Sequence, residues 1–152
     1  MKLQLLAFAL IFLASFGAAA AQEDAGKKEL AALAGDWRLV KGEANGESAN
    51  DYVIENLTCV IKGDRLTFGG IKPLTDKFSE LTIKIDGSTT PKCIDLTVQA
   101  GSLKDDILEG IYECKEDELR LCFYVGKGNR PLEFKAEGGS DRVLLELKRE
   151  KP

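Results

Sequence analysis

The chain has 152 residues, with 21 lysines and arginines against 25 aspartates and glutamates, and it contains no histidine. The lack of histidine excludes Ser-His and Cys-His catalytic pairs, and nearly all transition-metal sites except those built from thiolates or carboxylates. The mild excess of acidic residues is spread along the chain, so we expect no binding of nucleic acid and no polybasic contact with anionic lipid.

The first 21 residues have the pattern of a signal peptide. Lys2 precedes an apolar run from Leu3 to Phe16, and Ala19 to Ala21 place small residues at the positions that signal peptidase requires. The alternative is an uncleaved membrane anchor, but the run is shorter than the ~20 residues of a spanning helix. We therefore expect residues 22–152, with 20 basic and 25 acidic residues, to be one exported domain without stable membrane insertion, periplasmic or extracellular.

A short helix is predicted to end just before the first strand. Leu30 and Leu33 share one face at helical spacing, and Gly35 stands where the end of a helix favours positive φ. Trp37 and Leu39 then lie on one side of a period-two pattern. We expect Trp37, the only tryptophan, to plug a β-barrel whose floor the short helix covers.

Alternating apolar residues predict a series of short strands along the rest of the chain. The polar stretch Gly42–Val53 is the longest predicted connection and is expected to form a mobile flap or rim. Strands are predicted within 53–62, 65–68, 81–85, 94–98, a hairpin over 107–125, a short strand from 132 to 134, and 143–147. In the hairpin, a turn at Glu116–Asp117 pairs Tyr112 with Leu121, Cys114 with Leu119, and Glu113 with Arg120.

These eight or nine strands predict an all-β fold, an up-and-down antiparallel β-barrel with one short N-terminal helix. A β-sandwich is the alternative, and the sequential hairpins favour the barrel.

Residues 22–152 also resemble a lipocalin-like domain family that is expanded in planctomycete bacteria. The segments that carry the resemblance are Leu33-Ala-Gly-Asp-Trp37, Lys62-Gly-Asp64, Thr82-Ile-Lys-Ile-Asp86, Pro91-Lys92, Ile94-Asp-Leu-Thr97, Gly110-Ile-Tyr-Glu113, Arg130-Pro131 and Leu147-Lys-Arg149. The resemblance implies a lipocalin-like barrel and no assigned activity. It also implies that a basic residue near the last strand, Arg142 or Arg149, packs on Trp37.

Four single cysteines allow disulfides in an exported chain. The alternation places Cys59 and Cys114 inward, and Cys93 and Cys122 outward. The outward pair lies two strands apart, roughly 9–10 Å, which exceeds the ~7 Å Cα reach of a disulfide. This geometry favours two buried thiols and two surface thiols over a disulfide, a redox pair or a thiolate metal site.

The predicted inward positions carry no charged side chain and a single hydroxyl, that of Tyr112. An active site needs convergent polar groups with shifted pKa values. We therefore expect no enzyme activity, no catalytic residue, no metal and no cofactor. An esterase or glycosidase with paired carboxylates is the least favoured function, because the alternation places the carboxylates outside. The glycine-rich stretch Gly126–Arg130 is interpreted as a hairpin loop rather than a phosphate cradle, since no helix N-terminus follows it.

Two functions are consistent with this pattern. The first is an exported binding module that takes a small apolar ligand at the open end of the barrel, with the Gly42–Val53 loop as a lid and an aromatic wall formed by Trp37, Phe68, Tyr112, Phe123 and Phe134. The second is a structural or interaction module with a filled core that binds a protein or a cell-surface polymer through its loops. An eight-stranded barrel is wide enough for either arrangement, and the many large aliphatic residues favour filling.

Overall fold

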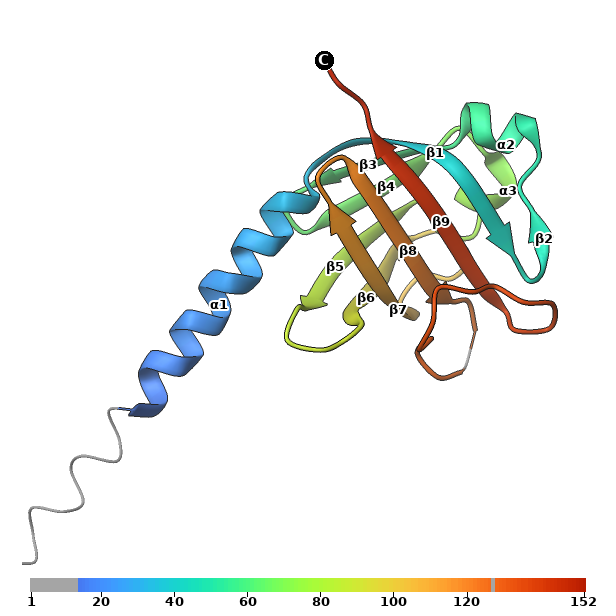
Figure 1. The fold of residues 1–152 in the computed structure, drawn as a ribbon. Helices are drawn as coiled ribbons and strands as arrows, with labels where there is room; N and C mark the ends of the chain where they lie inside the picture. Colours follow the sequence, from blue (N-terminus) through green and yellow to red (C-terminus); the bar gives the residue numbers. More distant parts are fainter. Residues whose placement is uncertain (1–13, 127) are drawn as a thin grey trace, which may run out of the picture.

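The computed structural model describes residues 14–126 and 128–152, and in it nine strands form one antiparallel sheet that closes on itself (Figure 1). The strands are β1 (Gly35–Ala44), β2 (Glu47–Ser48), β3 (Thr58–Lys62), β4 (Arg65–Gly69), β5 (Glu80–Asp86), β6 (Lys92–Ala100), β7 (Ile107–Lys115), β8 (Glu118–Tyr124) and β9 (Arg142–Arg149). Strands β3 to β9 pair in chain order, β1 pairs with both β3 and β9 to close the barrel, and β2 is an extra edge strand. The predicted up-and-down barrel is confirmed.

The hairpin β7–β8 has the predicted register. Tyr112 lies opposite Leu121, Cys114 opposite Leu119, and Glu113 opposite Arg120. Apolar side chains therefore meet on the inner face and opposite charges meet on the outer face, which fixes the register on both sides of the sheet.

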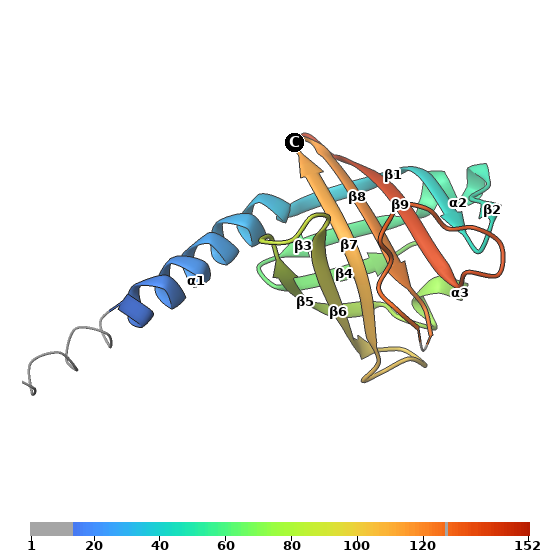
Figure 2. The same cartoon turned by 60° about the horizontal axis from the view of Figure 1, so that its bottom comes forward.

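Helix α1 (Ala14–Leu33) closes one end of the barrel with its last turns and projects away from it (Figures 1 and 2). Leu33 and Trp37 are 1% exposed, and Trp37 Nε1 donates a hydrogen bond of 2.9 Å to the Leu33 carbonyl. The guanidinium of Arg149 lies 4.3 Å from the centre of the Trp37 ring and donates to the Ala32 carbonyl. Of the two candidate basic residues, Arg142 and Arg149, it is Arg149 that packs on the tryptophan.

Gly35 joins this helix to β1 in the way that its position predicts. Its φ is 141°, a conformation that side chains rarely adopt, and a Cβ there would lie 2.7 Å from Arg149 Nη1. Glycine therefore allows both the turn into the strand and the close passage of the arginine. Residues 1–13, most of the predicted signal peptide, lie outside the described part of the chain. No helix in the described residues is long and apolar enough to span a membrane.

The opposite end of the barrel differs from the prediction of a long polar loop. There β1 continues to Ala44, and two short helices follow, α2 (Asp51–Asn56) and α3 (Lys72–Thr75), both at the end away from α1 in Figures 1 and 2. The side chain of Asn50 caps α2 by accepting a 3.0 Å hydrogen bond from the Val53 amide. The segment 51–56 is therefore helical, neither the predicted loop nor the start of the predicted strand.

The barrel interior is one continuous cluster of apolar side chains contributed by every strand from β1 to β9 except the short β2. At its centre Phe78 meets Phe68 and Phe123 edge to face, with ring centres 5.9 Å and 6.0 Å apart. Among the described residues, no polar or charged residue is buried as a whole. The period-two alternation therefore identifies the inner face correctly along most of the strands.

A second apolar cluster lies on the outer face of the sheet. Ile111, Cys122 and Leu144 come from three neighbouring strands, and residues 128–141, which we call the strap, cover them with Ala136 and Phe134. The predicted strand at 132–134 is wrong, since the strap forms no ladder with the barrel. Proline at 131 has no N–H to donate, which is consistent with this irregular course.

Candidate functional site

The structure separates the five residues of the predicted aromatic wall. Four lie inside the barrel and are almost completely buried: Trp37, Phe68, Tyr112 and Phe123. The predicted inward position of Phe134 is wrong, because this residue belongs to the strap and packs on the outer face. The period-two pattern assigns an inner face only to residues in a strand, and residues 132–134 form no strand.

Tyr112 and Phe134 both line a groove at the edge of the barrel. This groove has a volume of about 480 Å³ and opens to solvent. It is bordered by the β5–β6 turn, the end of β7, one residue of β8 and the strap; its lining residues are Gly87, Ser88, Thr89, Thr90, Pro91, Lys92, Tyr112, Glu113, Cys114, Lys115, Arg120 and Phe134. Its size is within the range of small-molecule sites.

Glu113 holds two cations on one side of the groove. Its Oε1 accepts from Lys115 Nζ at 2.9 Å, and its Oε2 accepts from Arg120 Nε at 3.0 Å and also from Nη2. Hydrogen bonds from Lys115 and Arg120 hold the pKa of Glu113 below its ordinary value. The guanidinium of Arg120 also lies 4.2 Å from the centre of the Phe134 ring, a cation–π contact. Arg120 is therefore fixed between a carboxylate and an aromatic face.

Tyr112 links the groove to helix α1. Its hydroxyl donates a 2.5 Å hydrogen bond to Glu29 Oε2, and Lys92 Nζ lies 2.8 Å from Glu29 Oε1. The Lys92 and Tyr112 hydrogen bonds lower the pKa of Glu29, whereas burial and the Glu29 contact raise the pKa of Tyr112. Sequence reasoning missed Glu29 because it is 83 residues from Tyr112 and no local pattern marks it.

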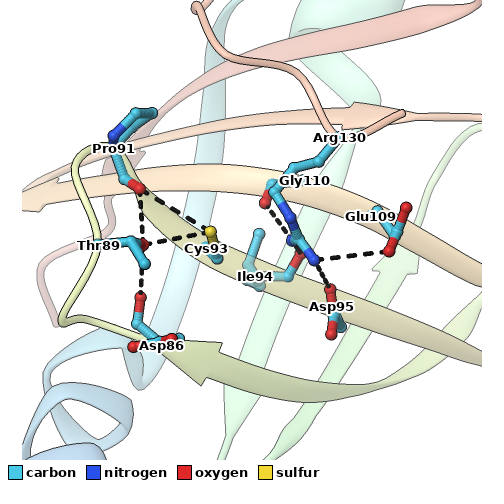
Figure 3. A network of polar contacts seen from close by, with 9 residues as sticks. All are labelled: Asp86, Thr89, Pro91, Cys93, Ile94, Asp95, Glu109, Gly110 and Arg130. Atoms are coloured by element: carbon cyan, nitrogen blue, oxygen red, sulfur yellow. Dashed lines mark hydrogen bonds and ion pairs between the residues drawn. The ribbon is translucent and has the colours of Figure 1, made fainter. Parts of the chain in front are cut away.

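A polar network holds the β5–β6 turn that borders the groove (Figure 3). Thr89 Oγ1 lies 2.8 Å from the Pro91 carbonyl and 3.2 Å from Cys93 Sγ. The turn begins with Asp86, whose side chain accepts a 2.9 Å hydrogen bond from the Ser88 amide. This is the turn chemistry that the run from Asp86 to Pro91 predicts.

Arg130 holds the strap against the barrel (Figure 3). Its Nη1 donates to the Gly110 carbonyl at 2.7 Å and to the Ile94 carbonyl at 3.0 Å, while Nη2 pairs with Asp95 at 2.7 Å. Arg130, one of the two basic residues of the Gly126–Arg130 stretch, is thus bound to β6 and β7. These contacts position Phe134 at the groove.

All four cysteines are free thiols. Cys59 is buried inside the barrel, which raises the pKa of its thiol to about 12. Cys122 faces outward as predicted, but the strap buries it, so its prediction as a surface thiol is wrong. Cys114 packs against the interior as predicted, but it is half-buried and lines the groove, so its prediction as a buried thiol is wrong. Cys93 lies beside Thr89 in the turn.

Comparisons with protein-family models, with curated proteins and with solved structures find no match to this chain. Within the groove, Glu113 pairs with Lys115 and Arg120, whereas Lys92 and Tyr112 bond to Glu29 of α1. The groove thus brings an arginine that is held on two sides together with the apolar side chains of Pro91, Tyr112 and Phe134.

Proposed function

We propose that the chain is an exported, non-catalytic binding module whose binding surface is the outside of the barrel. The observation that carries this proposal is the continuous apolar packing of the interior, from Trp37 at one end through Phe123 and Phe78 to Leu57 at the other. A lumen occupied by its own side chains leaves little volume for a ligand. A protein, a polymer or a small molecule would then bind to the outer surface, at the groove on the edge of the barrel or at the loops.

Membership of the lipocalin-like domain family is part of this proposal. It is supported by the closed up-and-down barrel, by the helix before β1 and by the packing of Arg149 on Trp37. Export is supported by the signal-peptide pattern of residues 1–21. Cell fractionation combined with intact mass tests export and cleavage: we expect a chain that begins at Gln22 outside the cytoplasm, and a chain that stays in the cytoplasm with Met1 would contradict export.

A second candidate function is binding of a small apolar ligand inside the barrel at the α2–α3 end. It is supported by the loose packing of α2 and α3 on this end of the barrel, since neither helix contains a fully buried residue. Such a ligand would have to displace buried side chains such as Phe78.

Backbone amide shifts of Leu57 and Phe78, which are buried next to α2 and α3, separate the two candidates together with the emission of Trp37, the only tryptophan, at the α1 end of the interior. Native mass spectrometry of the protein from its own source shows whether a ligand co-purifies, and stripping that ligand should leave Trp37 emission unchanged. Saturable quenching of Trp37 by hexadecanoate or another apolar ligand would instead support the lumen and contradict the outer surface.

A further inference from the structure

We propose that the groove binds a small carboxylate with an aromatic body, using Arg120 and Lys115 for the carboxylate and Phe134 for the ring. This inference rests on the proposed function in one respect, that binding occurs outside the barrel, and it names the class of ligand. Its basis is the arrangement around Glu113 and Phe134.

The groove already binds one carboxylate, that of Glu113. Both of its oxygen atoms accept hydrogen bonds, Oε1 from Lys115 and Oε2 from Arg120. The side chains of Lys115 and Arg120 are 78% and 41% exposed, so both cations are accessible from solvent. A guanidinium has five N–H donors, and Nη1 of Arg120 is not used in the contact with Glu113. A second carboxylate can therefore bind beside Glu113 or exchange with it.

The charge of the lining favours an anion. The lining contains three cationic side chains, those of Lys92, Lys115 and Arg120, and one carboxylate, that of Glu113. The whole chain, in contrast, has a net charge of −4. Lys92 is partly neutralised by Glu29, whose carboxylate lies outside the groove lining. The groove thus has a local positive excess on an acidic protein, and such an excess attracts anionic ligands.

The apolar part of the lining favours a flat body. The guanidinium of Arg120 covers part of the Phe134 ring, and the outer cluster packs against the same side chain. The part of the ring that stays exposed lies beside the carboxylate-binding donors, where a ligand ring can contact it. Pro91 and Tyr112 extend this wall across the groove. The apolar side chains of the lining are those of Pro91, Tyr112, Cys114 and Phe134, a set that matches one aromatic ring better than a long alkyl chain.

A titration followed by NMR tests the inference with three probes. Phenylacetate carries both the ring and the charge, phenylacetamide lacks the charge, and octanoate lacks the ring. We expect phenylacetate to shift the backbone amides of residues 112–120, with an affinity about fivefold higher than that of either other probe. Equal affinity for phenylacetamide would overturn the role of the two cations, and tighter binding of octanoate would overturn the aromatic body.

Two variants of the groove should change the affinity for phenylacetate in opposite directions, whereas a general loss of folding would weaken binding in both. Arg120→Gln removes a ligand contact and should weaken phenylacetate binding about threefold or more. Glu113→Gln removes the competing carboxylate and should strengthen it by a similar factor. Arg65→Gln is the matched control, since Arg65 pairs with Glu80 at 3.0 Å outside the groove lining and should leave the affinity unchanged.

The outcomes distinguish this inference from the proposed function. A separate pocket lies between α1 and β5, lined by Ala25, Gly26 and Lys84 among others. Weaker binding by Glu113→Gln, no binding of phenylacetate at millimolar concentration, or shifts confined to that pocket would overturn the inference alone. Shifts of interior amides together with a change in Trp37 emission would overturn the outer-surface function as well.

Discussion

Replacement of Phe123 by alanine measures how completely the interior of the barrel is filled. Phe123 is fully buried and meets Phe78 edge to face at 6.0 Å. Moving a phenylalanine side chain back to water costs about 1.5–3 kcal/mol, and the cavity left in a packed core raises the total to about 3–5 kcal/mol. We therefore expect the free energy of unfolding to fall by about 4 kcal/mol in Phe123→Ala.

Phe134→Ala is the matched control, because it removes the same side chain from the outer face. Phe134 is half-buried and contacts Arg120, so we expect a loss of about 1 kcal/mol. Urea unfolding followed by Trp37 fluorescence measures both variants, with the slope of the transition unchanged. If Phe123→Ala does not fold, Phe123→Leu replaces it with an expected loss of about 1–2 kcal/mol.

A hollow barrel would give a different result. If Phe123→Ala costs less than about 2 kcal/mol, or no more than Phe134→Ala, then no new cavity forms in a packed core. The interior would then have room for a ligand, and the reasoning that assigns binding to the outer surface would be refuted.

Three further predictions follow from contacts in the described residues. Arg149→Gln removes the cation–π contact with Trp37 and the hydrogen bonds to the end of α1, so it should lower the free energy of unfolding by about 2 kcal/mol. It should also shift the emission of Trp37, and unchanged emission would contradict the contact between the two side chains. The folded-state pKa of Glu29 is lowered by its lysine and tyrosine partners, so its carboxylate stabilises the fold at neutral pH and loses this effect as the pH falls below the ordinary glutamate pKa. Glu29→Gln should therefore be less stable than wild type near pH 7, with a smaller difference at about pH 3, when both are unfolded with urea; a constant difference would argue against the ionic contact. Finally, the thiols of Cys59 and Cys122 are buried, with raised pKa values, so Ellman's reagent should label them only after unfolding and the intact mass should not change on reduction.

The barrel could be predicted because its determinants are local. Alternation with period two assigns each strand an inner face, and matched pairs such as Glu113 with Arg120 fix the register of a hairpin without knowledge of the rest of the fold. Gly35 likewise shows in the sequence where the helix ends. The Asn50 cap marks the start of α2 in the sequence, but the apolar residues Val53, Ile54 and Leu57 also fit the beginning of a strand, so the pattern alone does not separate the two.

The groove could not be predicted because it is built from distant segments. Leu132 and Phe134 alternate with charged residues as in a strand, yet Arg130 binds the strap to β6 and β7, and the Phe134 ring packs on the outer face. The pairing of Tyr112 with Glu29 likewise depends on the docking of α1, 83 residues away. The sequence by itself determined the strands, their inner faces and the buried tryptophan, because short-range periodicity specifies them. Only the tertiary structure decided which outer side chains share a groove, because contacts between distant segments leave no periodic signal in the chain.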